Sequence, residues 1–168
     1  MKYLLLILSS IVLAYLIVVF FIYFYQRNLL YHPSENNYQN DKAKFNYEEV
    51  YIDVDDKIRL KSWFINKDLK KFKTLLIFHG NAGDLSNRIY KLNELNKLDI
   101  NILLISWRGF SGNKGSPTEK NLYQDGKASI KWLNDKNIDN NKIILYGESL
   151  GTGVALEMAK DKKFNSII

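Results

Sequence analysis

The stretch IILYGESLGTGVALEMAK, residues 143–160, decides how the chain folds. Its first residues, Ile143 to Tyr146, form an apolar run typical of a strand buried on both faces of a sheet. Gly147-Glu148-Ser149-Leu150-Gly151 follows directly, and small and apolar residues then continue at helical spacing. The stretch therefore predicts a buried strand, a tight turn centred on Ser149, and a helix from Leu150 to Lys160.

The turn has the pattern G-x-S-x-G, with Gly147 and Gly151 two residues to either side of Ser149. A sharp turn between strand and helix leaves no room for side chains at those two positions. It also pushes the serine hydroxyl out at a helix N-terminus, whose partial positive charge favours a developing anion. We therefore predict Ser149 as a catalytic nucleophile. The alternative is a plain tight turn with a hydroxyl at a helix N-cap.

The other segments extend this pattern to an α/β fold, a mostly parallel sheet flanked by helices. Two runs of alternating polarity, 47–54 and 58–65, predict an antiparallel hairpin. Apolar runs predict buried strands over 74–78 and 100–107, each followed by a glycine-containing loop and a helix. Because buried strands alternate with helices, we expect right-handed crossovers between parallel strands. Residues 165–168 predict the start of one more strand.

Two helices are expected after these loops. In the first, Ile89, Leu92, Leu95 and Leu98 recur at helical spacing. The second is expected to begin at Thr118, because a threonine followed by Glu119 is typical of a helix N-terminus.

The loop His79-Gly80-Asn81-Ala82-Gly83 follows the first strand expected in the parallel set. Its glycines would let backbone amides come within hydrogen-bond distance of a substrate carbonyl oxygen. We predict the backbone amides of Asn81 and Leu150 as the donors of an oxyanion hole. His79 is expected to hold the loop by hydrogen bonds, and a role as general base is the alternative.

A second glycine-rich loop, residues 108–117, is expected to face the same crevice and to have a structural role. Arg108 is predicted to form a buried ion pair, for which Asp125 on the next helix is a candidate partner. Asp125 is not expected to be a catalytic acid, because in this kind of fold the acid follows the serine in sequence. The predicted supporting residues of the turn and loops are His79, Gly80, Arg108, Gly147 and Gly151.

Residues 3–25 contain no charged side chain and are rich in Leu, Ile, Val, Phe and Tyr. At about 1.5 Å per residue, such a helix covers the roughly 30 Å hydrocarbon core of a bilayer. A signal peptide would end in small residues, and a helix of a soluble core would show a polar face. We predict a single-pass anchor with its flanks at 1–27, a linker at 28–44 and a globular domain at 45–168. Basic residues flank both ends, so orientation is left open.

Composition limits the other function classes. The 168 residues include 24 Lys plus Arg and 18 Asp plus Glu, a formal charge of +6, but the lysines are scattered, so nucleic-acid binding is not expected. There is no Cys, which excludes thiolate nucleophiles and disulfides. We see no metal-ligand constellation, phosphate loop or dinucleotide fingerprint, so neither a metal nor a cofactor is expected. The expected partners are the lipid bilayer and a small-molecule or acylated substrate, and the oligomeric state is left open.

Three motifs together carry a family resemblance: HGNAGD at 79–84, WRGFSGNKGSPTEKNLYQDG at 107–126 and YGESLGTGVALEMA at 146–159. In this order they resemble the membrane-anchored serine hydrolases of the alpha/beta-hydrolase superfamily, the group that includes alpha/beta hydrolase domain-containing protein 13. The resemblance covers residues 47–168. It implies an eight-stranded sheet and a catalytic triad completed by an Asp after a later strand and a His near the C-terminus, neither of which is located here.

Since such a domain needs about 200 residues, we expect the chain to be the N-terminal part of a hydrolase domain. Ser149 would attack an ester, thioester or amide carbonyl and form an acyl-enzyme, and the truncated chain itself would be inactive. Two alternatives stay open: a non-catalytic membrane-anchored binding protein, and an acyltransferase. Acyl lipids and acylated proteins are candidate substrates through their closeness to a membrane.

Overall fold

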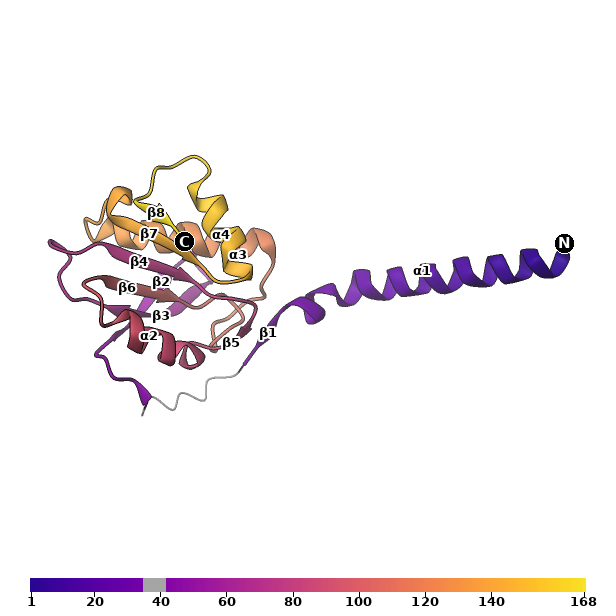
Figure 1. Cartoon of the computed structure of the whole chain (residues 1–168), viewed down its shortest axis with the longest axis horizontal. Helices are drawn as coiled ribbons and strands as arrows, with labels where there is room; N and C mark the ends of the chain where they lie inside the picture. Colours follow the sequence, from indigo (N-terminus) through magenta and orange to yellow (C-terminus); the bar gives the residue numbers. More distant parts are fainter. Residues whose placement is uncertain (35–41) are drawn as a thin grey trace. The chain divides into compact units, whose positions relative to one another are not determined.

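A computed structural model of the chain describes residues 1–34 and 42–168, which divide into two units, Met1–His32 and Pro33–Ile168. The first unit is the long helix α1 (Lys2–Leu30), none of whose residues is buried (Figure 1). Its length and composition make it a candidate membrane span. The helix continues to Leu30, so residues 28–30 of the predicted linker are helical. Part of that linker, residues 35–41, lies outside the described residues.

The second unit is built on a six-stranded sheet in the order β2-β3-β6-β4-β7-β8. Strand β2 is antiparallel to β3 and β3 is antiparallel to β6, whereas the remaining neighbours are parallel. This arrangement confirms the predicted hairpin and the mostly parallel sheet. The strands are β2 (Glu48–Asp53), β3 (Arg59–Ile65), β4 (Thr74–Phe78), β6 (Asn101–Ile105), β7 (Ile143–Gly147) and β8 (Ser166–Ile167). A separate two-stranded sheet pairs β1 (His32–Pro33) with β5 (Ala82–Gly83).

The register of the sheet brings the ends of its central strands together. Phe78, the last residue of β4, pairs with Gly147, the last residue of β7. Ile77 pairs with Leu104 of β6, so that strand ends at nearly the same level. The loops that leave these three strands therefore begin side by side at the carboxyl edge of the sheet, which is the edge where ligands bind in open α/β sheets.

Helix α2 (Ile89–Leu95) packs against one face of the sheet through apolar residues of its inner side. Ile89 and Leu92 share a buried cluster with residues of β3, β4 and β6. The expectation that Leu98 belongs to this helix is wrong. The helix ends at Leu95, and Leu98 is exposed.

Helices α3 (Glu119–Asp135) and α4 (Leu150–Ala159) pack against each other and against the sheet (Figure 1). The hydroxyl of Thr118 accepts a hydrogen bond from the Asn121 amide at 3.2 Å and caps α3, which agrees with the predicted start of this helix. Gly126 lets the two helices approach, because a Cβ there would lie 3.0 Å from Val154. Trp132 of α3 meets Phe64 of β3 edge to face.

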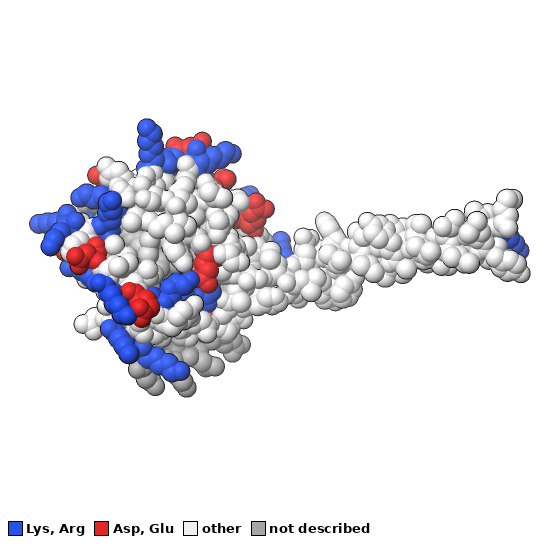
Figure 2. All heavy atoms as spheres, in the orientation of Figure 1, with Lys and Arg blue, Asp and Glu red and all other residues white. Residues whose placement is uncertain are grey.

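Charge is distributed differently over the two units. Lys, Arg, Asp and Glu are scattered over the face of the second unit seen in Figure 2, whereas α1 is uncharged between its ends. A helix with no charged residue over 3–25 and no buried residue has its apolar surface exposed on all sides.

Candidate active site

Ser149 lies between the end of β7 and the start of α4, in a strained backbone conformation. Its φ of 51° and ψ of −112° are rare for a residue with a side chain. The amide of Gly151 donates to the carbonyl of Glu148 at 2.9 Å, and the amide of Thr152 donates to that of Ser149 at 3.0 Å. The strand thus becomes a helix within a single turn.

Both glycines of the motif are required by packing. A Cβ at Gly147 would lie 2.7 Å from the Thr152 nitrogen, and one at Gly151 would lie 2.6 Å from the Phe78 carbonyl carbon. Both distances are shorter than real Cβ contacts. Gly151 therefore lets α4 begin directly against the end of β4.

The glycine loop after β4 lies beside Ser149. A Cβ built at Gly80 would be 3.6 Å from the Cβ of Ser149 and 3.5 Å from the carbonyl oxygen of Glu148. The amide of Glu148 also donates to the carbonyl of Phe78 at 2.9 Å, which ties the turn to the end of β4, where the loop begins. Asn81 follows Gly80 directly, and Leu150 is the first residue of α4, whose amide has no acceptor within the helix. The structure therefore brings together the two segments that carry the predicted oxyanion-hole donors.

His79 is fully buried beneath this loop, and both of its ring nitrogens have partners. Nδ1 donates to the carbonyl of Gly80 at 2.7 Å, and Nε2 accepts from the amide of Trp107 at 3.4 Å. Burial, aided by the charge of Arg88, lowers the pKa of His79 to about 3. The ring is therefore neutral near pH 7 and supports the loop, an arrangement that does not suit a general base for Ser149.

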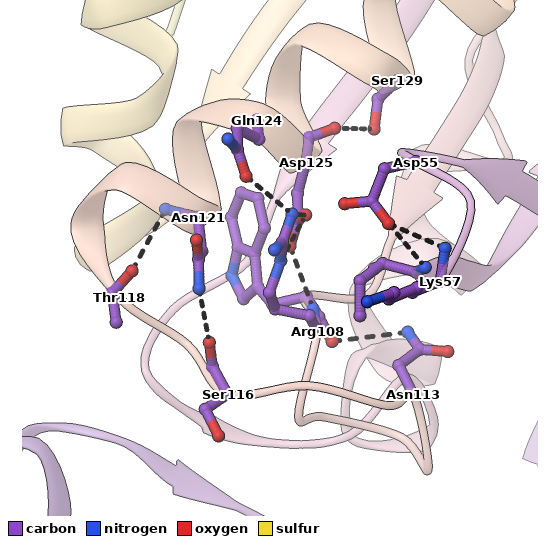
Figure 3. A network of polar contacts seen from close by, with 12 residues as sticks. Asp55, Lys57, Arg108, Asn113, Ser116, Thr118, Asn121, Gln124, Asp125 and Ser129 are labelled. Carbon is purple, nitrogen blue, oxygen red and sulfur yellow. Dashed lines mark hydrogen bonds and ion pairs between the residues drawn. The ribbon is translucent and has the colours of Figure 1, made fainter.

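Arg108 and Asp125 form the buried ion pair that the sequence suggests (Figure 3). Arg108 Nη2 and Nε donate to Oδ1 of Asp125 at 2.6 and 2.8 Å, and the Arg108 amide donates to Oδ2 at 3.0 Å. The pKa of the Asp125 carboxyl is raised, because the effect of burial outweighs that of the hydrogen bonds from Arg108. The pair ties the start of the loop at 108–117 to α3.

Asp55 on the turn between β2 and β3 lies next to this pair in Figure 3. Its carboxyl accepts hydrogen bonds from the amides of Lys57 and Ile58, both at 2.9 Å, and these bonds lower its pKa. The Asn113 side chain bridges the second loop to β3, since it accepts from the Lys61 amide at 2.8 Å. These contacts give the 108–117 loop a structural role.

Several polar residues near the turn were not anticipated from the sequence. Lys91 on α2 donates to Glu148, the residue before Ser149, at 2.6 Å. Arg88 is buried and donates to the carbonyl of Asp84 at 3.0 Å. Arg88 and Lys91 are three residues apart, a spacing that places side chains on one helix face and is the only sequence signal for them. Among the described residues, no group of three or more His, Cys, Asp or Glu side chains could hold a metal ion.

The family model described as alpha/beta hydrolase fold matches residues 73–168. The alpha/beta hydrolase domain-containing protein WAV2 of Arabidopsis thaliana is 29% identical over 146 residues, covering 82% of this chain and 47% of the plant protein. Protein bem46 of Schizosaccharomyces pombe is 32% identical over 147 residues, covering 81% of this chain and 49% of the yeast protein. The chain thus spans about half the length of these curated relatives.

Solved structures agree with the fold. An esterase of Pyrococcus furiosus superposes with a TM-score of 0.63 at 24% identity, covering 80% of this chain and 52% of the esterase. An alpha-beta hydrolase of Vibrio vulnificus gives a TM-score of 0.62 at 26% identity, covering 72% of this chain and 44% of that protein. The family model alone covers more than half of the sequence, so the chain belongs to the alpha/beta hydrolase fold family.

Proposed function

We propose that the chain carries the nucleophile and the oxyanion hole of a serine hydrolase that cleaves an ester, thioester or amide. The observation that carries this proposal is the positive φ of Ser149 at a turn with the glycine loop alongside. A strained serine at the carboxyl edge of a sheet is the geometry that exposes a nucleophilic hydroxyl. The esterase among the solved structures supports the same reaction class.

In the proposed reaction, the Ser149 oxygen attacks the substrate carbonyl carbon while a base takes its proton. The negative oxygen of the tetrahedral intermediate accepts hydrogen bonds from the amides of Asn81 and Leu150. Expulsion of the protonated leaving group produces an acyl ester on Ser149, which water then hydrolyses. The partial positive charge at the start of α4 favours the same oxygen.

The base and its acidic partner are assigned to segments of a longer chain. The sequence contains two histidines, and His79 is neutral with both ring nitrogens hydrogen-bonded. The other, His32, is exposed, and its Nε2 lies 3.1 Å from the carbonyl oxygen of Leu29. We therefore propose that residues 1–168 alone are inactive.

A fluorophosphonate probe, which reacts with activated serines, tests this proposal. In membranes containing the chain extended along its reading frame, we expect labelling at Ser149 and its loss in Ser149→Ala. Residues 1–168 alone should label at least about 1,000-fold more slowly, since loss of a triad member costs several orders of magnitude in rate. Equal labelling of the extended chain and its Ser149→Ala variant would contradict the proposal.

A second candidate function, a non-catalytic binding protein, is favoured by one observation: His79 does not suit a base. The two functions differ in one outcome. A binding protein would leave the extended chain unlabelled at Ser149, although the turn and the loop are intact.

We propose further that α1 anchors the hydrolase domain in a membrane, so acyl lipids and acylated proteins are the proposed substrates. The helix is long enough to span, because 29 residues at about 1.5 Å each exceed the roughly 30 Å of hydrocarbon. Transfer of the acyl group to an acceptor other than water would use the same acyl-enzyme. Product analysis with and without an added alcohol acceptor distinguishes transfer from hydrolysis.

A further inference from the structure

Asp84, which follows the glycine loop directly, is a buried centre of hydrogen bonds with 4% of its surface exposed. Its Oδ1 accepts from the Ser86 hydroxyl at 2.5 Å and from the Asn87 amide at 3.2 Å. Its own amide donates to the Asn87 side chain at 2.8 Å. These partners lie within three residues of Asp84 and fix the start of the turn that leads into α2.

The second carboxyl oxygen of Asp84 is bound by a residue distant in sequence. The hydroxyl of Ser34 donates to Oδ2 at 3.0 Å, across 50 positions of the chain. The Ser34 amide also donates to the carbonyl of Gly83 at 3.2 Å. Ser34 thus holds two consecutive residues of the loop end, one by its backbone and one by its side chain.

The loop end needs such support because its backbone is unusual. Gly83 has a φ of 81°, and a Cβ there would lie 2.8 Å from Nη1 of Arg88. The same Nη1 donates to the carbonyl of Asp84, and the Leu85 amide donates to the Ser111 hydroxyl at 3.1 Å. Contacts from three parts of the chain therefore converge on residues 83–85.

We infer that Ser34 is a positioning residue that acts through Asp84 to fix the glycine loop at 79–83. The functional part of this inference rests on the proposed function, in which the loop supplies the Asn81 amide. Donors of an oxyanion hole must keep their positions within about 0.5 Å, and this requires supporting contacts. Ser34 follows the anchor helix closely in sequence. The segment after this helix therefore helps to hold the site in place.

Amide hydrogen exchange on residues 1–168 in detergent micelles tests the structural part without any need for activity. Without the Ser34 hydroxyl, Oδ2 of Asp84 loses the partner that it has among the described residues, so we expect the Asp84 and Leu85 amides of Ser34→Ala to exchange about fivefold faster. Ser34→Thr keeps the hydroxyl and should restore the rates. Ser116→Ala, at an exposed serine of the other loop, is the matched control.

Unchanged exchange at both amides in Ser34→Ala would overturn the inference. So would equally faster exchange at the buried strand residues Leu76 and Leu103, because the effect would then be a global loss of stability.

The fluorophosphonate probe on the extended chain tests the positioning role. We expect Ser34→Ala to lower the rate constant of labelling about fivefold, with recovery in Ser34→Thr and no change in Ser116→Ala. Faster exchange with an unchanged labelling rate would overturn the positioning role. If the unsubstituted extended chain does not label at Ser149, the proposed function fails, and the exchange rates still decide whether Ser34 fixes the loop.

Discussion

Ser149 holds a backbone conformation that costs about 1–3 kcal/mol relative to ordinary regions of φ and ψ. The neighbouring bonds maintain it: the amides of Glu148, Gly151 and Thr152 all have backbone acceptors around the turn. The motif predicts this geometry because each glycine is a steric requirement. Five consecutive residues are therefore enough to predict the turn.

The first prediction concerns Gly151. Gly151→Ala should lower the free energy of unfolding by about 1–3 kcal/mol, because its Cβ would overlap the backbone at Phe78 and force α4 away from β4. Urea unfolding in micelles, followed by tryptophan fluorescence, measures the change.

The matched control is Gly153→Ala, two residues further along α4, where a Cβ would meet nothing within 4 Å. Because alanine is the better helix former, this variant should be as stable as the parent or more stable by about 0.5–1 kcal/mol. Equal effects of the two substitutions would refute the packing argument.

The second prediction is a pH dependence that comes from His79. Its pKa of about 3 in the folded chain lies below the roughly 6.5 expected when unfolded, so between these values only the unfolded state binds the proton. This contribution to stability is fully present above about pH 6.5 and falls by about 1.4 kcal/mol per pH unit as the pH decreases toward 3.

Urea unfolding between pH 4 and pH 7 measures this slope. His79→Gln should flatten it, even though the variant is less stable than the parent near pH 7, while His32→Gln should retain it. If the slopes of the parent and of His79→Gln were the same, the proton would be taken up elsewhere.

Other contacts of the site depend on residues far apart in sequence, and no local pattern predicts them. Lys91 reaches Glu148 across 57 positions and Ser34 reaches Asp84 across 50. The first contact forms because the sheet places the ends of β4 and β7 together, and the second because β1 pairs with β5 just before Asp84. The Arg108–Asp125 pair was easier to anticipate, because Asp125 lies only 17 positions away on the next helix.

At the scale of elements, the carboxyl edge of the sheet is held from both faces. Helix α2 contacts the turn through Lys91, and α3 holds the loop at 108–117 through Asp125. Apolar runs predicted the strands well, because a strand covered by helices must be apolar on both faces. The order of the strands could not be predicted in the same way. Strand β6 lies between β3 and β4, and this order depends on how the helices pack.

The third prediction is that Asp125 is essential to the stability of the second unit. Asp125→Ala leaves the Arg108 guanidinium buried without its carboxyl partner, so we expect a loss of about 3–5 kcal/mol. Asp135→Ala on the same helix removes only the exposed pair with Lys131 and should change the free energy of unfolding by less than about 1 kcal/mol. Chemical unfolding of both variants measures the difference, and a loss below 1 kcal/mol for Asp125→Ala would contradict a structural role for the pair.

At the scale of the whole molecule, the chain joins an apolar helix to the part of an alpha/beta hydrolase fold that contains the strained serine. The apolar helix is visible in the sequence because hydrophobicity without a polar face differs plainly from the alternating patterns that follow it. The apolar run ends where Gln26, Arg27 and Asn28 interrupt it, whereas the helical backbone continues to Leu30.

The fourth prediction is that α1 alone decides membrane attachment. The full chain should stay in the membrane pellet after washing at alkaline pH, whereas a variant lacking residues 3–25 should move to the soluble fraction, because charged side chains are scattered over the face of the second unit that Figure 2 shows. Replacing residues 3–25 by an equally long run of Leu and Ala is the control, and it should restore attachment if apolar length is the cause. Retention of the deletion variant in the washed pellet would locate a second membrane contact on the second unit.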